Sequence, residues 1–198
     1  MAIAIGCWQT ATKPVWTRRA HIMEGDYAFH SQGDIARAHS EYQRASDADE
    51  LSPEPYERLA NLEFQKWVNS AGSDGGGFDF WQQFAVHLNP NHFGEYLTVG
   101  EWRLAMFDRT RSYGDAFAAA QEFAIATDLY PNSPRLQSLA AEAWWKAWGD
   151  RKAIPAAQKA LELHEINHAA GHIDKELPPE RVALMRVILS GKPFGRDP

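Results

Sequence analysis

Cysteine is nearly absent from this chain, and runs of like charge and long apolar stretches are absent too. The single cysteine, Cys7, cannot form an internal disulfide, so the covalent framework implies no oxidising compartment. Twenty basic side chains stand against 26 acidic ones, and no basic patch is present that would neutralise phosphates. Nucleic acid is therefore not an expected partner. With 198 residues and 44% hydrophobic content, the chain can still bury a core.

Residues 1–12 form an apolar segment that is too short to span a bilayer and lacks the positive flank of a secretory signal. Two interpretations stay open. The segment is either a packing element at the start of the first helix or the end of a transmembrane helix. The second interpretation rests on an apolar run with Trp8 that is followed by Lys13, Arg18 and Arg19. It predicts a membrane tether.

A spacing of small and aromatic residues recurs along the chain. Gly, Ala, an aromatic residue and Ala follow at steps of five, four and three in Gly33, Ala38, Tyr42 and Ala45, and again in Gly114, Ala119, Phe123 and Ala126. Glycine lets the chain reverse between two helices, alanine lets their backbones approach, and the ring fills the groove. The pattern resembles the tetratricopeptide repeat (TPR) family. That resemblance implies an all-α, TPR-like α-solenoid of about four helix pairs.

The other two units follow the pattern less closely. Gln82 occupies the aromatic position before Ala85, and alanine takes that position in the last unit, Gly149, Ala153, Ala157 and Ala160. Helical periodicity, with apolar residues at steps of three and four, predicts the first helix of each pair: Trp16, Ala20, Met23 and Tyr27; Tyr56, Leu59, Ala60 and Trp67; Tyr96, Val99, Gly100, Leu104 and Phe107; Leu136, Leu139, Ala140, Ala143 and Trp144.

These patterns predict a repeat domain over residues 13–177, a capping helix over 178–190 and a flexible tail over 191–198. The stretch from Asn69 to Gly77 is expected to be a loop between helices. It is not a phosphate-binding loop, because no Lys-Ser/Thr pair follows the glycines.

Three features give the whole chain a wider resemblance: the apolar segment before Arg18, the phrase from Asp128 to Ser133, and the tail from Ala160 to Pro178. They are similar to the soluble carboxy-terminal extension of some bacterial O-antigen ligase-like membrane proteins. In such proteins the membrane part carries the ligase chemistry. The resemblance therefore implies an organising role in surface-polysaccharide assembly, on the cytoplasmic side of the membrane, with no catalytic residue and no cofactor.

One motif predicts a different function. The run from His164 to Asp174 reads HExxHxxGxxD, which resembles a minority form of the metzincin zinc-protease signature. His164, His168 and Asp174 would be zinc ligands, and Glu165 would take the proton of the bound water. His172 extends the four-residue spacing, which also allows a metal site without catalysis. Such enzymes need a sheet before the active helix, and helical periods precede this motif. A non-catalytic module is therefore the expectation, with the zinc peptidase as the alternative.

A helix-pair solenoid presents the first helices of its pairs on a concave surface, where a protein or peptide partner is expected to bind. Aromatic and arginine side chains dominate the energetics of interfaces. The predicted partner-binding residues are Trp16, Tyr27, Glu63, Trp67, Arg103, Arg111 and Trp148.

Overall fold

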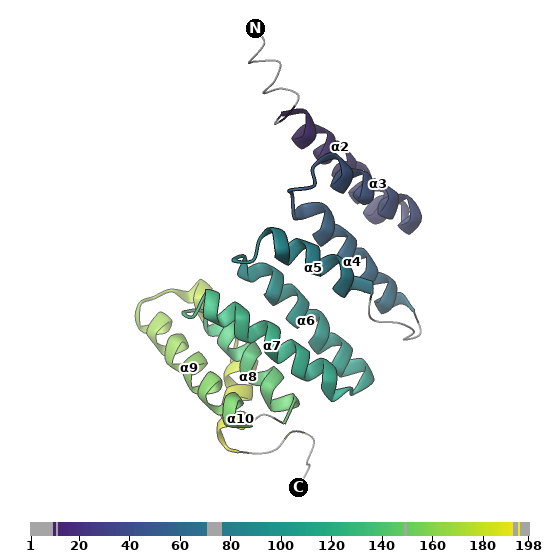
Figure 1. Cartoon of the computed structure of the whole chain (residues 1–198). Coiled ribbons are helices and arrows are strands. Elements are labelled where there is room, and N and C mark those ends of the chain that lie inside the picture. Colours follow the sequence, from purple (N-terminus) through teal and green to yellow (C-terminus); the bar gives the residue numbers. More distant parts are fainter. Residues whose placement is uncertain (1–9, 11, 71–76, 149, 192–193, 195–198) are drawn as a thin grey trace. The chain divides into compact units, whose positions relative to one another are not determined.

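The computed structural model describes residues 10, 12–70, 77–148, 150–191 and 194, and within them the chain forms helices and no strand. The elements are α2 (Lys13–Tyr27), the π-helix η2 (Ala28–Gln32), α3 (Ile35–Ala48), α4 (Glu54–Asn69), α5 (Gly77–Leu88), α6 (Phe93–Thr110), α7 (Tyr113–Leu129), α8 (Pro134–Lys146), α9 (Asp150–Ala169), the 3-10 helix η3 (Ile173–Lys175) and α10 (Pro179–Leu189) (Figure 1). The predicted all-α class is confirmed.

The chain divides into two compact units, residues 1–90 and 91–198. One continuous repeat domain over residues 13–177 stays a prediction. Most of the apolar segment 1–12, of the loop after Asn69 and of the tail 191–198 lies outside the described residues, as does Gly149. In the part of the chain that is described, no helix combines the length and the apolar character needed to cross a membrane.

In the first unit, α2 and α3 form one antiparallel pair and α4 and α5 form the next (Figure 1). Ala38, Tyr42 and Ala45 lie on the buried face of α3, as the repeat pattern predicted. Gly25 of α2 lies directly under the Tyr42 ring, so a side chain there would collide with the ring. The chain reverses after η2 at Gly33, whose φ of 66° is in the left-handed region that favours glycine.

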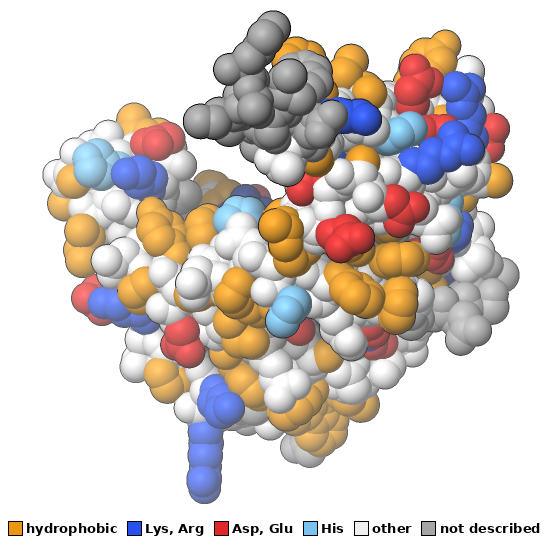
Figure 2. Space-filling model, turned by 45° about the horizontal axis from the view of Figure 1, so that its top comes forward, with side chains coloured by type: hydrophobic (Ala, Val, Ile, Leu, Met, Phe, Trp, Pro, Cys, Tyr) orange, Lys and Arg blue, Asp and Glu red, His pale blue; other side chains and the backbone are white. Residues whose placement is uncertain are grey.

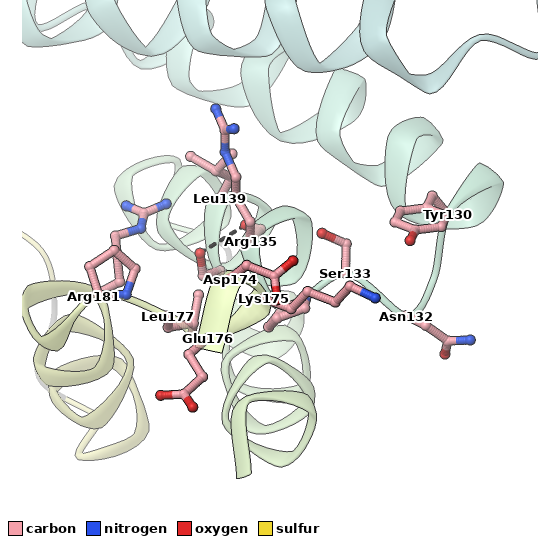
Figure 3. A pocket seen from close by; sticks show the side chains of 13 residues that line it. Tyr130, Asn132, Ser133, Arg135, Leu139, Asp174, Lys175, Glu176, Leu177 and Arg181 are labelled. Carbon is pink, nitrogen blue, oxygen red and sulfur yellow. Dashed lines mark hydrogen bonds between the residues drawn. The ribbon is translucent and has the colours of Figure 1, made fainter. Parts of the chain in front are cut away.

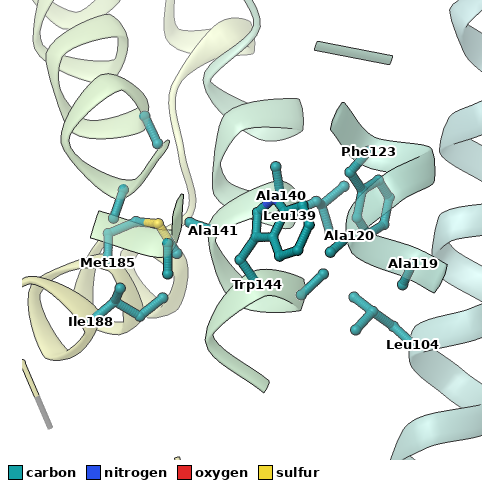
Figure 4. Close-up of a cluster of buried hydrophobic side chains, with 14 of the residues drawn as sticks. Leu104, Ala119, Ala120, Phe123, Leu139, Ala140, Ala141, Trp144, Met185 and Ile188 are labelled. Atoms are coloured by element: carbon teal, nitrogen blue, oxygen red, sulfur yellow. The ribbon is translucent and has the colours of Figure 1, made fainter. Parts of the chain in front are cut away.

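In the second unit, α6 pairs with α7, α8 pairs with α9, and α10 packs against α8 and α9. One core cluster joins these helices, with Phe123 of α7 and Leu139 and Trp144 of α8 among its large side chains (Figure 4). Met185 and Ile188 of α10 close the cluster. The small residues that the repeat pattern predicted in this unit have no exposed surface. They are Ala119, Ala126, Ala153, Ala157 and Ala160. Phe123 has no exposed surface either. The repeat spacing therefore located the helix contacts of this unit.

Helix α2 forms where apolar periodicity predicted the first helix, but the apolar residues of that pattern do not face the core. Trp16, Met23 and Tyr27 are exposed, and α2 packs through the opposite face, which includes Ile22. Polar contacts hold that opposite face to its neighbours: Arg18 donates to Ser52 at 2.5 Å, and the His21 ring is 2.7 Å from a Glu41 carboxylate oxygen. Apolar periodicity alone could not show that the core side of this helix is partly charged.

The predicted role of Gly114 in chain reversal is wrong. Gly114 lies inside the first turn of α7, and the residue in the left-handed conformation is Arg111, with φ 59° and ψ 23°, at the end of α6. Arginine at such a position carries a strain that glycine avoids.

Replacing Arg111 with glycine is therefore expected to raise the free energy of unfolding by about 0.5–1 kcal/mol, because it relieves this strain. Urea denaturation followed by circular dichroism measures the change. The matched control is the reverse exchange, Gly33→Ala, at a position with the same backbone conformation and with open space around it. It is expected to destabilise by about 1 kcal/mol. Equal effects of the same sign in both variants would contradict the argument.

Candidate partner-binding sites

The seven predicted partner-binding residues have different environments. Trp16, Tyr27 and Trp148 are 64%, 54% and 62% exposed, and Arg111 is exposed as well. Trp67 is buried and its ring stacks on Phe64, with 5.7 Å between centroids. Trp67 therefore belongs to the core, and only 4% of it is exposed to a partner in this conformation. The sequence could not separate it from exposed aromatic residues because both occur at helical spacing.

Glu63 and Arg103 are held by close ion pairs inside their own unit. Glu63 accepts from Lys66 at 2.6 Å, and Arg103 pairs with Asp115 across α6 and α7 at 3.3 Å. The Arg103 side chain is mostly buried. It therefore joins α6 to α7 and offers little surface to a partner.

Arg111 and Trp148 come together at one corner of the second unit. The Tyr113 ring meets Trp148 edge-on at 5.4 Å and lies 6.1 Å from Phe107, and the Arg111 guanidinium is over the Phe107 ring at 5.7 Å. Tyr113 is itself 53% exposed. Hydrophobic side chains also reach the surface elsewhere, interspersed with charged ones (Figure 2).

A pocket of about 550 Å³ lies in the second unit, where the α7–α8 connection meets the α9–α10 connection. Figure 3 shows its lining side chains. They are Tyr130, Asn132, Ser133, Pro134, Arg135, Ser138, Leu139, Asp174, Lys175, Glu176, Leu177, Pro178 and Arg181. Ser133 fixes one side of the pocket because its hydroxyl caps α8, accepting from the Leu136 N–H at 3.2 Å.

The other side of the pocket is fixed by contacts between the α9–α10 connection and α9. The Leu177 N–H donates to His164 Nδ1 at 3.1 Å, and Asn167 donates to the Lys175 carbonyl at 3.1 Å. Glu176 lies 3.1 Å from the His168 ring. These contacts hold residues 174–177 in place as a wall, although the only regular structure there is the short 3-10 helix Ile173–Lys175.

The pocket has an apolar floor and a polar rim. Leu139 and Leu177 are buried in the floor, whereas Tyr130 at the rim is exposed and stacks on Phe93 with 5.2 Å between centroids. In Figure 3 the Lys175 side chain extends toward Ser133 and Asn132. An apolar cavity with a few polar groups at its edge suits an apolar side chain whose backbone is held at the rim.

The two sequence phrases that carried the wider resemblance meet at this pocket. The phrase ending in Ser133 supplies one side, and the tail before Pro178 supplies the other. The pocket could not be predicted from the sequence, because its two sides come from phrases that are separated by a whole helix and are not periodic. The turn-forming residues of the two phrases were the feature of the sequence that could have indicated these connections.

The HExxHxxGxxD run forms the end of α9 and the connection after it, and both histidines of the predicted ligand set contact other groups. His164 Nδ1 accepts the Leu177 N–H, and Asp174 is an exposed residue of the pocket lining. Among the described residues, no three His, Cys, Asp or Glu side chains are placed to hold a metal ion. The described part of the chain also contains no strand to align a substrate. The geometry of these residues therefore gives the zinc-peptidase alternative no support.

Stacked antiparallel helix pairs with alanine contacts and a terminal helix define a TPR-like α-solenoid. No protein-family model and no curated protein match the chain.

Solved structures do match. One titled "Crystal structure of MamA" is 16% identical, with a TM-score of 0.58 over 83% of this chain and 86% of that one. TTC0263, a thermophilic TPR protein in Thermus thermophilus, is 16% identical, with a TM-score of 0.50 over 88% of this chain and 97% of that one. At this identity the likeness shows the TPR-like fold.

Proposed function

We propose that this chain is a non-catalytic protein-interaction module, and that its pocket in the second unit receives an apolar anchor side chain from a partner segment. The observation that carries the proposal is the pocket itself, which combines buried Leu139 and Leu177 with an exposed polar and aromatic rim. Interfaces draw most of their binding energy from a few anchors that fill such pockets. A helix-pair scaffold holds both walls rigidly, which lowers the entropy lost on binding.

Selection from a phage-displayed library of random peptides tests this proposal with the intact chain. The selected peptides are expected to share an apolar residue. Their affinity is expected to fall about tenfold in the double variant Tyr130→Ala/Lys175→Glu, because the rim loses a ring and reverses one charge. Fluorescence anisotropy with a labelled selected peptide measures the change.

The control variant is Lys159→Glu, which reverses one exposed charge on α9 outside the pocket lining. Its affinity for the same peptide is expected to equal that of the wild type. A peptide that binds the double variant and the wild type equally well would place the binding site elsewhere and refute the role of the pocket.

A finer form of the proposal follows from the resemblance to O-antigen ligase-like proteins. In this form, the partner belongs to a surface-polysaccharide assembly system and the module works at the cytoplasmic side of the membrane. Its support is in the sequence, in the two phrases that line the pocket. A tether through residues 1–12 is part of this form. Those residues lie almost entirely outside the described part of the chain. Removing them is expected to release the protein from the membrane fraction of its native cells, which immunoblotting of the fractions measures.

A further inference from the structure

The outward face of α2 is an apolar stripe with no covering element among the described residues. Trp16 and Met23 are each 64% exposed, Tyr27 is 54% exposed, and Ala20 between them is exposed as well. The core contacts of the helix lie on the opposite face, around Ile22. A contiguous exposed stripe of large apolar side chains marks an interaction surface.

The spacing of the stripe is that of a seam between two helices. Trp16, Ala20, Met23 and Tyr27 follow at steps of four, three and four, which keeps them on one line along the helix. A second helix with the same alternation of steps can therefore lie along the whole stripe.

An antiparallel copy of α2 itself matches the stripe. When two copies are related by a two-fold axis that passes between His21 and Ile22, Trp16 of one copy faces Tyr27 of the other. Ala20 then faces Met23, so a small side chain meets a long flexible one. Such a self-complementary surface is what a two-fold interface requires, because the same patch serves both copies.

Charge favours the antiparallel arrangement. Beside the stripe, the first half of α2 carries Lys13 and Arg19, and the second half carries Glu24 and Asp26. These two carboxylates also pair with Arg37 and Arg58 of their own unit, at 2.9 and 3.3 Å, but each keeps exposed surface. An antiparallel pair sets opposite charges against each other, whereas a parallel pair would align like charges. At 100° per residue, Arg19 and Asp26 lie on the same flank of the stripe. Arg19 is exposed and has no ion pair within the described part of the chain, so it is available for this contact.

We propose that the chain self-associates through α2 as an antiparallel, two-fold symmetric dimer. The seam holds four apolar residues per copy, which is less than the roughly 800 Å² per partner of a standard interface. The dissociation constant is therefore expected at about 10–100 µM. This surface lies in the first unit and does not depend on the proposed pocket function.

Sedimentation equilibrium of the full chain across this concentration range tests the proposal. The wild type is expected to shift from monomer to dimer. Met23→Glu is expected to stay monomeric, since it sets a carboxylate into each half of the apolar seam. Leu51→Glu is the matched control, because Leu51 is an exposed apolar residue of the same unit outside α2. It should dimerise like the wild type. Circular dichroism confirms that each variant is folded.

Disulfide cross-linking in a Cys7→Ser background tests the orientation. A mixture of Ala20→Cys and Met23→Cys proteins is expected to form the mixed disulfide in preference to either homodimer, because these positions face each other only in the antiparallel pair. Disulfides that form within each variant alone would indicate a parallel pair and overturn the proposal. A wild type that stays monomeric at about 500 µM, well above the expected dissociation constant, would overturn it too. That result would mean that another segment covers the stripe or that nothing binds it.

Discussion

Replacing Glu142 with alanine is expected to lower the free energy of unfolding by about 3 kcal/mol, because it removes the carboxylate between two partly buried cations. Glu142 lies on α8 with a side chain that is 15% exposed. It accepts from Lys146 of the same helix at 2.8 Å and from Arg181 of α10. Lys146 is 9% exposed and also pairs with Asp108 of α6 at 2.8 Å. The network thus joins α6, α8 and the terminal helix.

Urea denaturation of wild type and variant measures this loss, and Glu162→Ala is the control. Glu162 pairs with Lys159 at 3.0 Å on the exposed surface of α9, where such pairs contribute less than about 1 kcal/mol. A similar loss in both variants would show that the buried network contributes no more to the free energy of unfolding than an exposed ion pair does. The loss in Glu142→Ala is expected to be far larger.

The same network makes stability depend on pH. Burial raises the pKa of Glu142, but the hydrogen bonds and charges of Lys146 and Arg181 outweigh burial, so the net pKa is lower than its ordinary value. A carboxyl group whose pKa is lower in the folded state stabilises the fold above its unfolded pKa, and that contribution is lost as the pH falls through the folded pKa. Glu142→Ala should therefore flatten the fall in stability of the wild type in acid.

The sequence predicted the helix pairs because their contacts repeat. Ala119, Phe123 and Ala126 lie on the buried side of α7 at the predicted spacing. In α8, Leu136 and Ala143 are buried as helical periodicity predicted. A position that must be small, or must fill a groove, constrains the residue type strongly, and the period of the helix then places its neighbours.

The other features depend on contacts that no local pattern encodes. The packed side of α2 is held by Arg18 and His21, so its most apolar side faces outward. The pocket needs two connections that are distant in the sequence. Gln82, at a position where the repeat expects a ring, is buried all the same. In each case tertiary packing determines an arrangement that the local sequence does not specify.

Replacing Gly100 with alanine is expected to lower the free energy of unfolding by about 2 kcal/mol, although alanine favours the helix by up to about 1 kcal/mol. A Cβ atom at Gly100 of α6 would lie 2.5 Å from Phe123 Cε1 and 2.8 Å from its Cδ1 and Cζ atoms. Phe123 is fully buried within the core of the second unit, so its ring has no free space to move into. The two helices would have to separate, and core contacts would be lost.

Gly114→Ala makes the same exchange at the start of α7, where the nearest atom to the new Cβ is Ser112 Oγ at 3.6 Å. It is expected to leave stability unchanged or to raise it by up to about 1 kcal/mol, because only the helix preference acts. Urea denaturation of both variants therefore distinguishes the effect of core packing from the effect of helix propensity. If the two variants had equal stability, α6 and α7 would not approach each other at Gly100. The repeat pattern would then have predicted the helices correctly but not their contact.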